Sequence, residues 1–171
     1  ITVKSKKGKG AIFFVTIPYT PTQYKLAKTT LEQKISENSK HHCKILIAED
    51  EEINYLYLEI LIKDKISLDC AIIHAKDGEE AVSICNNQHD INFVLMDLKM
   101  PNMNGFEALK LIKKKHPKLP IVAQTAFSSA EDIEKIKAAG FDDFISKPIS
   151  EEALKIVLKG IKKRQKKTNP K

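Results

Sequence analysis

Residues 93–105 read Phe-Val-Leu-Met-Asp-Leu-Lys-Met-Pro-Asn-Met-Asn-Gly, and this stretch decides the fold. Its first four residues are continuously apolar, which is typical of a parallel strand buried on both faces. The run ends at Asp97, and the proline, asparagines and glycine that follow favour a sharp turn before a helix. Asp97 is therefore predicted at the carboxyl end of a central strand, the edge where open α/β sheets bind ligands. Taken alone, Asp97 would more simply be a helix-capping residue. A ligand-binding role therefore needs support from other parts of the sequence.

The length and composition indicate one globular domain with an appendage. A chain of 171 residues, 42% hydrophobic and 30% charged, can bury one full core but hardly a second. It contains neither a run of about 18 apolar residues nor a signal-peptide pattern. The first residue is Ile1 rather than methionine, so we interpret the sequence as a piece of a longer protein. We expect this piece to be cytoplasmic.

The cysteine count and the net charge exclude few classes of function, and each has a simple structural explanation. The three cysteines, Cys43, Cys70 and Cys85, are an odd number without a Cys-x-x-Cys motif, so we expect reduced, partly buried thiols. His41-His42-Cys43 could ligate a metal, but adjacent side chains diverge, and a polar linker end is the simpler interpretation. Much of the net charge of +7 lies in the last ten residues, which favours a solvated terminus over nucleic-acid binding.

From Lys44 onward, apolar runs typical of strands alternate with stretches of helical periodicity, and five strand–helix units fit the chain. This alternation predicts a parallel sheet with crossover helices. The predicted fold is α/β, a flavodoxin-like doubly wound sheet of five parallel strands in the order 2-1-3-4-5 with helices on both faces. The expected strands are residues 45–48, 68–74, 93–96, 120–124 and 144–146.

The predicted helices carry recognisable caps and apolar repeats. Asp77, Ser129 and Ser150 are expected to cap the second, fourth and fifth helices, and Gly140 to end the fourth in a left-handed conformation. In the first helix, the apolar residues that repeat at helical spacing are Ile53, Leu56, Tyr57, Ile60 and Leu61.

Polar side chains follow four of the predicted strands. The first strand runs into Glu49-Asp50, the third into Asp97, the fourth into Thr125 and the fifth into Lys147-Pro148. In the predicted strand order these groups converge on one edge of the sheet. Crowded carboxylates repel one another unless a cation compensates them, and an all-oxygen ligand set selects a hard divalent ion such as Mg²⁺.

We expect Asp50 and Asp97 to ligate Mg²⁺ directly, with the backbone carbonyl of Lys99 nearby and Glu49 bound directly or through water. An aspartate beside Mg²⁺, a lysine and a threonine hydroxyl is suited to accept a phosphoryl group on its carboxylate. Lys147 would neutralise the phosphoryl oxygens, Thr125 would bond one of them, and the small Ala126 leaves the approach open.

With these residues placed, residues 43–165 resemble the receiver domain of two-component response regulators. The motifs that match in order and spacing are Ile-Leu-Ile-Ala-Glu-Asp, Leu-Met-Asp-Leu-Lys-Met-Pro-Asn-Met-Asn-Gly, Gln-Thr-Ala and Ser-Lys-Pro. The resemblance implies that Asp97 accepts a phosphoryl group from phosphohistidine and that Lys147-Pro148 is a cis peptide. It also implies a switch in which Thr125 moves toward the phosphoryl group, Phe144 turns inward, and the face of the fourth helix, fifth strand and fifth helix changes.

Three positions depart from the commonest receiver pattern or tune it. Glu49 replaces the aspartate that often comes first in the acidic pair, which leaves its direct contact with the metal open. Lys99 and Phe127, two residues past Asp97 and Thr125, lie where the family tunes dephosphorylation, and we expect Phe127 to hinder the attacking water and to lengthen the phosphoryl lifetime.

The amino terminus carries a second, shorter resemblance. Residues 1–5 alternate apolar with polar, residues 6–10 form a glycine-bearing turn, and residues 11–17 are strongly β-prone. Together they predict a β-hairpin, which is marginal in water unless it packs on something or pairs with another copy. Residues 8–19 resemble the closing strands of a histidine-kinase ATP-binding domain. The predicted organisation is a partial kinase domain (1–19), a linker (20–42), a receiver domain (43–165) and a basic tail (166–171).

The combined resemblance implies a fragment of a hybrid sensor histidine kinase, a transferase whose kinase machinery lies outside this piece. Its expected partners are the phosphohistidine donor domain and a histidine phosphotransfer protein or downstream regulator, with no direct contact to nucleic acid; a homodimer is left open. The alternative is a stand-alone regulator that binds protein or nucleic acid. A flavin carrier is disfavoured because clustered carboxylates repel a flavin phosphate, and a haloacid-type phosphatase because it needs Asp-x-Asp at the nucleophile.

Overall fold

The structure is a computed structural model that describes residues 1–16, 43–126 and 129–168, except for the side chains of 162–168. The predicted linker, Phe127 and the last three residues lie outside the described residues. The chain divides into two compact units, Ile1–Ser39 and Lys40–Lys171, and each is considered by itself.

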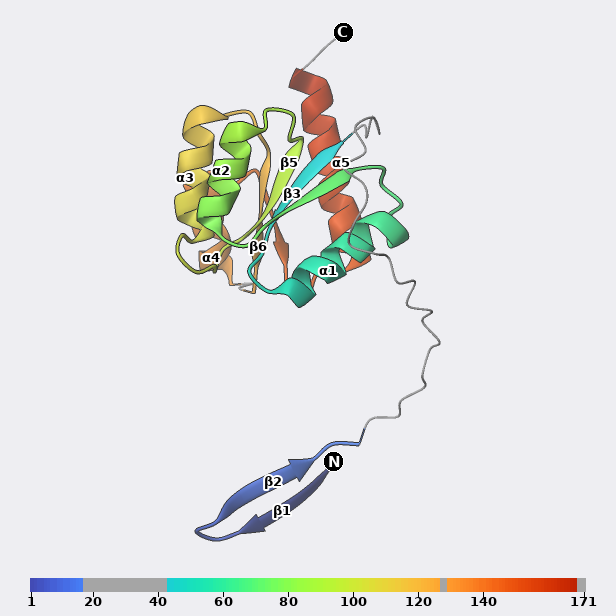
Figure 1. Cartoon of the computed structure of the whole chain (residues 1–171), viewed down its shortest axis with the longest axis vertical. Coiled ribbons are helices and arrows are strands. Elements are labelled where there is room, and N and C mark those ends of the chain that lie inside the picture. The colour runs from blue at the N-terminus through green and yellow to red at the C-terminus, as the bar shows by residue number, and fades with distance from the viewer. Residues whose placement is uncertain (17–42, 127–128, 169–171) are drawn as a thin grey trace, which may run out of the picture. The chain divides into compact units, whose positions relative to one another are not determined.

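The larger unit is built around a parallel sheet of five strands (Figure 1). The strands are β3 (Lys44–Ala48), β4 (Ala71–Ala75), β5 (Phe93–Asp97), β6 (Ile121–Thr125) and β7 (Asp143–Ser146). They lie in the order β4-β3-β5-β6-β7, which is the predicted order 2-1-3-4-5 counted within this sheet. All four pairings are parallel, so the carboxyl ends of the strands share one edge.

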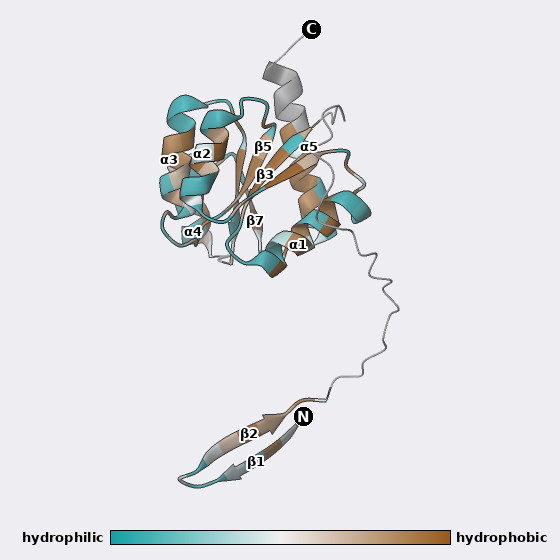
Figure 2. Ribbon diagram, in the orientation of Figure 1, coloured by the Kyte–Doolittle hydropathy of each residue, from teal (hydrophilic) through white to brown (hydrophobic). Residues whose placement is uncertain are grey.

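Helices cover both faces of this sheet. They are α1 (Glu52–Ile60), the π-helical turn η1 (Leu61–Lys65), α2 (Gly78–Asn87), α3 (Gly105–Lys115), α4 (Ala130–Ala139) and α5 (Glu151–Thr168). Residues of α2, α3 and α4 share one apolar cluster with the sheet, and those of α1, η1 and α5 share the other. Figure 2 shows the strands as a largely hydrophobic layer between helices that carry both hydrophilic and hydrophobic residues. Among the described residues, no helix has the length and apolar character needed to cross a membrane.

The helix ends follow the predicted caps. Asp77 accepts a hydrogen bond from the Glu80 amide at 2.8 Å, and Ser129 caps α4 in the same way. Gly140 ends α4 with φ of 99°, a left-handed conformation that costs glycine little. Gly105 begins α3 so close to β5 that an added Cβ would lie 2.2 Å from the carbonyl oxygen of Asp97. A side chain at residue 105 would therefore displace the end of the strand that carries Asp97.

The apolar repeat read from the first helix is not its buried side, apart from Leu61. Ile53 and Ile60 are 79% and 52% exposed, and Leu56 and Tyr57 are exposed as well. The residues that face the core are Leu58, Leu61 and Ile62. Apolar residues occur on several sides of this helix, so periodicity alone could not decide which side packs on the sheet.

The prediction of three reduced cysteines is wrong for two of them. Cys43 and Cys70 form a disulfide, with Cα atoms 4.5 Å apart, while Cys85 is free and buried. The two bonded cysteines precede Lys44 and Ala71, which are paired in the β3–β4 ladder, and the Ala71 amide donates to the Cys43 carbonyl. Residues 27 positions apart in sequence are thus brought together by strand pairing, which cysteine counting cannot detect.

Two element boundaries also differ from the predictions. The strand expected at 68–74 begins only at Ala71, because Leu68 and Cys70 donate their amides within the turn that follows η1. Helix α5 continues to Thr168, so the first residues of the predicted basic tail are helical.

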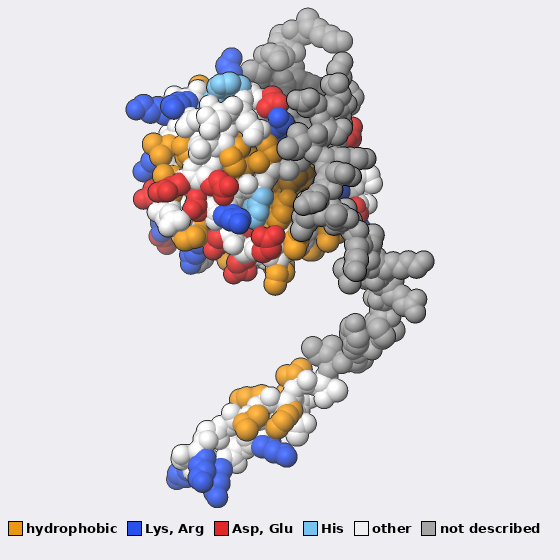
Figure 3. All heavy atoms as spheres, in the orientation of Figure 1, with side chains coloured by type: hydrophobic (Ala, Val, Ile, Leu, Met, Phe, Trp, Pro, Cys, Tyr) orange, Lys and Arg blue, Asp and Glu red, His pale blue; other side chains and the backbone are white. Residues whose placement is uncertain are grey.

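The smaller unit contains the predicted hairpin, β1 (Thr2–Lys6) and β2 (Gly10–Phe14), paired antiparallel. All of its described residues are exposed, including Ile12 at 62% and Phe13 at 69%. Figure 3 shows its hydrophobic side chains uncovered and lysines gathered at its turn. Two strands with both faces exposed bury too little apolar surface to be stable alone.

Candidate functional site

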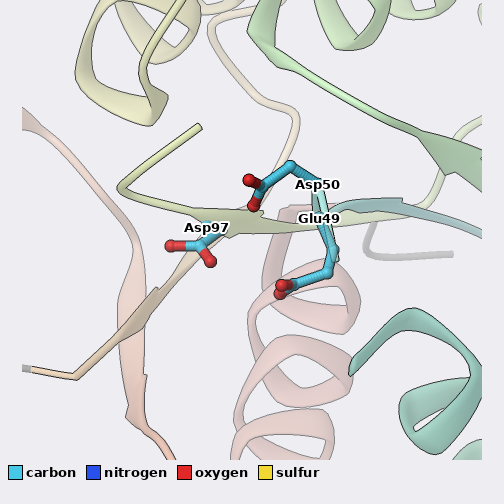
Figure 4. Close-up of side chains that lie close together, drawn as sticks. All are labelled: Glu49, Asp50 and Asp97. Carbon is cyan, nitrogen blue, oxygen red and sulfur yellow. The ribbon is translucent and has the colours of Figure 1, made fainter. Parts of the chain in front are cut away.

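A pocket of about 190 Å³ lies at the carboxyl edge of the sheet. Its charged walls come from the ends of three strands: Glu49, Asp50 and Glu51 follow β3, Asp97 and Lys99 lie at the end of β5, and Lys147 follows β7. Figure 4 shows the carboxylates of Glu49, Asp50 and Asp97 gathered where β3 and β5 end. Ligand oxygens of these three residues lie within 4.8 Å of one another. The structure thus brings together the acids that the sequence placed at separate strand ends.

Lys147 bridges two of these acids. Its Nζ donates to Glu49 Oε2 at 2.8 Å and forms a second ion pair with Asp97 Oδ2. Burial lowers the pKa of this ammonium, but its hydrogen bonds to Asp97 and Glu49 and the charges of both acids outweigh burial and raise the pKa above its ordinary value. Lys147 therefore stays charged in the pocket and compensates part of the negative charge.

Glu49 is completely buried and its side chain is held from two directions. Asn54 Nδ2, from α1, donates to Glu49 Oε1 at 2.9 Å, and Lys147 donates to the other carboxylate oxygen. A buried carboxylate needs such partners because desolvation is costly. Both oxygens are thus engaged by protein donors, whereas Asp50 is exposed at the pocket wall.

Asp97 and Thr125 line the pocket from the ends of the adjacent strands β5 and β6. Asp97 is 8% exposed, and its Oδ1 accepts from the backbone amide of Lys99 at 2.9 Å. Thr125 is 1% exposed and lines the pocket, and its carbonyl accepts from the Lys147 amide at 2.7 Å. The Asp97 carboxylate is therefore oriented from both sides, by Lys99 and by Lys147.

The remaining predicted residues occupy less central places. Phe144, on β7, is half-buried and packs against the cluster shared with α2, α3 and α4. The Lys147-Pro148 peptide is cis, as the resemblance implied. Ala126 lines the pocket and is exposed, while Phe127 falls outside the described residues.

The donor set suits a hard divalent cation. Four carboxylates and two lysines line the pocket, so its walls carry net negative charge. The three clustered acids offer oxygen ligands alone, and oxygen ligands select ions such as Mg²⁺ over thiolate- or imidazole-seeking metals. Binding a divalent cation would relieve the repulsion that Lys147 compensates only in part.

Three residues near the site were not found by sequence reasoning. Asn54 bonds Glu49, and His74 lies with its Nε2 2.8 Å from the Glu49 carbonyl oxygen. Gln124, the residue before Thr125, is fully buried, and neither of its amide atoms has a hydrogen-bond partner in the structure. Asn54 and His74 lie in no short motif, and Gln124 belongs to the Gln-Thr-Ala motif, which does not indicate its burial. Only the tertiary structure reveals these contacts.

The chain is similar in sequence to sensor kinases and to a response regulator. The chain is 33% identical over 159 residues to the autoinducer 2 sensor kinase/phosphatase LuxQ of Vibrio parahaemolyticus, an alignment that covers 90% of this chain and 18% of LuxQ. It is 36% identical over 116 residues to the two-component response regulator ORR41 of rice, covering 67% of this chain and 91% of that protein. The chain spans less than a fifth of the length of LuxQ and of the related sensor kinase CqsS of Vibrio cholerae.

A solved structure and a family model point the same way. The receiver domain of the Pseudomonas aeruginosa sensor histidine kinase PA1611 has 28% identity and a TM-score of 0.62, covering 69% of this chain and 95% of that one. That structure holds a magnesium ion in its active-site cleft. The family model for the response regulator receiver domain matches residues 45–159. The chain therefore belongs to the response regulator receiver family of two-component signalling.

Proposed function

We propose that this chain is part of a hybrid sensor histidine kinase and that its receiver domain accepts a phosphoryl group on Asp97 from a phosphohistidine. The observation that carries the proposal is the Asp97 carboxylate, oriented by Lys147 and the Lys99 amide beside two further acids in one pocket. The sequence given lacks the phosphohistidine helices and the nucleotide-binding loops of a kinase. The piece therefore acts as an acceptor rather than as a kinase.

The acid cluster would hold Mg²⁺ through Asp50 and Asp97, with Glu49 bound directly or through water and with the Lys99 carbonyl as a further ligand. When bound, Mg²⁺ supplies positive charge that stabilises the phosphoryl oxygens during transfer. Glu49 has both carboxylate oxygens engaged by Asn54 and Lys147, which favours an indirect role for it. Asp50, exposed at the pocket wall, is the better placed of the two for a direct contact.

In the proposed reaction an oxygen of the Asp97 carboxylate attacks the phosphorus of phosphohistidine. A phosphorus–oxygen bond forms and the phosphorus–nitrogen bond breaks, while the imidazole nitrogen keeps the electron pair and takes up a proton. Lys147 is already next to Asp97 and would follow the charge onto the phosphoryl oxygens. Thr125 would donate its hydroxyl to one of these oxygens.

The output is proposed to be a population shift between two conformations. A phosphoryl group adds roughly 1.5 to 2 negative charges at Asp97. Thr125 would move toward it and Phe144 would turn inward, changing the face formed by α4, β7 and α5. The shift can be no larger than the difference in interaction of the phosphoryl group with the two states.

The exposed side of α1 supports the assignment of a phosphohistidine-bearing domain as the partner. Four large side chains, Ile53, Leu56, Tyr57 and Ile60, are between 44% and 79% exposed on this helix. The helix begins two residues after Asp50 of the acidic pair, and its Asn54 lines the pocket. A domain that presents a phosphohistidine to Asp97 would cover this apolar surface as it docked.

The hybrid-kinase context rests on the relatives and on the hairpin. The alignment with LuxQ covers 90% of the chain, whereas residues from 43 onward make up about three quarters of it, so the match extends into the preceding segment. The exposed hairpin fits the edge of a larger ATP-binding domain that this piece does not include. The stand-alone regulator remains the second candidate, because rice ORR41 matches this chain over 91% of its own length.

The test is phosphorylation of the full chain by acetyl phosphate with Mg²⁺, read by intact-mass spectrometry. We expect a single phosphoryl adduct in wild type, its loss in Asp97→Asn, and its loss with EDTA. The matched control is Asp90→Asn, which changes an exposed aspartate that pairs with Lys44 away from the pocket. Equal adduct formation in wild type and Asp97→Asn would overturn the assignment.

A further inference from the structure

His74 connects the edge strand of the sheet to the acidic pair. It lies on β4, paired with Ile47 of β3, near the point where both strands end. The last backbone hydrogen bond between the two strands runs from the Glu49 amide to the Ala75 carbonyl at 3.0 Å. Beyond that bond, the His74 side chain takes over, with its Nε2 2.8 Å from the carbonyl oxygen of Glu49. Because a carbonyl oxygen can only accept, Nε2 carries the proton and donates it.

Tyr55 fixes the orientation of this imidazole. The two rings are stacked, with centroids 3.8 Å apart and planes inclined by 7°. Tyr55 lies on α1, so the histidine is held between a helix and the end of a strand. Rotation of the imidazole away from the Glu49 carbonyl would break the stack. The hydrogen bond is therefore part of a rigid contact rather than a freely rotating side chain.

With the His74 contact, the backbone amide, the carbonyl and both carboxylate oxygens of Glu49 each have a hydrogen-bond partner. Its amide donates to Ala75, its carbonyl accepts from His74, and its two carboxylate oxygens accept from Asn54 and Lys147. The carbonyl of Glu49 lies in the same rigid plane as the amide of Asp50, since the peptide bond between them is planar. Fixing that carbonyl thus fixes the direction in which Asp50 leaves the strand.

We propose that His74 is a positioning residue for the magnesium site, acting through the Glu49–Asp50 peptide. This inference rests on the proposed function, in which Asp50 and Asp97 bind Mg²⁺. Ligand oxygens of Glu49, Asp50 and Asp97 lie within 4.8 Å of one another. Keeping them so close requires that the backbone at Glu49 and Asp50 hold its conformation. Groups that orient metal ligands without touching the metal commonly change metal affinity by about 10- to 100-fold when they are removed.

The experiment measures Mg²⁺ binding to the full chain by isothermal titration calorimetry, together with thermal unfolding without Mg²⁺. His74→Phe keeps a ring for Tyr55 but has no donor, and we expect it to weaken Mg²⁺ binding at least about ten-fold. His74→Gln carries an amide donor near the position of Nε2 and should recover most of that affinity. The matched control, His89→Phe, makes the same change on an exposed histidine outside this pocket and should bind Mg²⁺ as wild type does.

A merely structural role for His74 predicts a different pattern. Both His74 variants would then unfold at lower temperature, while their folded fractions would bind Mg²⁺ with wild-type affinity, and this result would overturn the inference. Equal weakening by His74→Phe and His74→Gln would also overturn it. If His74→Phe does not fold, Tyr55→Leu, which frees the imidazole without removing the donor, should weaken binding several-fold, and wild-type affinity there would count against the proposal.

The same measurements separate this inference from the proposed function. A wild type that binds Mg²⁺ and is phosphorylated, with His74→Phe unchanged, removes only the positioning role. A wild type that neither binds Mg²⁺ nor accepts a phosphoryl group removes both.

Discussion

The two ends of the five-stranded sheet differ in how their charged side chains are compensated. At the amino end, charged side chains are paired one to one: Lys44 with Asp90 at 2.6 Å and Lys113 with Asp142 at 2.7 Å. The Cys43–Cys70 disulfide joins β3 to the residue before β4 at this end. At the carboxyl end, Lys147 alone bridges two acids while a third carboxylate lies beside them. One end is compensated internally, and the other keeps a surplus of negative charge.

The contrast indicates that the amino end of the sheet stabilises the domain, whereas the carboxyl end carries its proposed activity. Paired charges and a covalent link constrain the end of the sheet where no ligand is proposed to bind. Clustered carboxylates at the other end cost stability through their repulsion, and this cost is the condition for attracting a cation. Substitutions of equivalent charged residues at the two ends should therefore change the free energy of unfolding by different amounts, or in opposite directions.

The largest effect is expected from the lysines. Lys147→Met leaves a fully buried Glu49 and a largely buried Asp97 without their cation and should lower the free energy of unfolding by about 3 to 5 kcal/mol. Lys113→Met removes the partner of a partly exposed aspartate and should cost only about 1 kcal/mol. Urea denaturation of both variants measures the contrast, and equal costs at the two ends would contradict it.

The pH dependence of Lys147 sharpens this test. Because its pKa is raised in the folded state, the stability it contributes is fully present below the unfolded value of 10.5 and is lost as pH rises through the higher folded value. The difference in stability between wild type and Lys147→Met should therefore shrink above about pH 10.5. Taking the difference cancels other groups that titrate there, and a difference that stayed constant to the highest pH would argue against the shift.

The disulfide should give the next largest effect. It closes a segment of 27 residues, and cross-links of this loop size typically stabilise a protein by about 3 to 4 kcal/mol. Cys70→Ser should lose this stability without weakening Mg²⁺ binding, because the link lies at the opposite end from the pocket. Reductant is the control: it should destabilise wild type and leave the variant unchanged. Alkylation of both Cys43 and Cys70 in protein prepared without reductant would show that the bond does not form.

The smallest effect, and the only gain, is expected at Asp50. Asp50→Asn removes one of the clustered carboxylates and should raise stability without Mg²⁺ by about 0.5 to 1 kcal/mol. It should also abolish the stabilisation that Mg²⁺ gives wild type. Asp90→Asn, at the paired end, should instead be neutral or slightly destabilising. Thermal unfolding with and without Mg²⁺ measures both, and a loss of stability in Asp50→Asn would break the comparison.

The same contrast shows where sequence patterns were sufficient. The continuous apolar run before Asp97 was correctly predicted as a strand covered on both sides, and the strand order is the one expected of a flavodoxin-like doubly wound sheet. Once the order was known, Glu49, Asp50, Asp97, Thr125 and Lys147 had to share an edge. The predicted cap residues Asp77 and Gly140 were also confirmed, because a cap bonds to backbone groups only a few positions away in the chain.

By itself, the sequence determined the parallel sheet, its strand order and the edge where the acids meet, because these depend on local periodicity and on the common direction of the strands. The tertiary structure alone decided which side of α1 is buried, that Cys43 meets Cys70, and that His74 reaches the Glu49 carbonyl. These features depend on how two segments far apart in the chain come to lie together. A contact of that kind leaves no period and no motif in either segment.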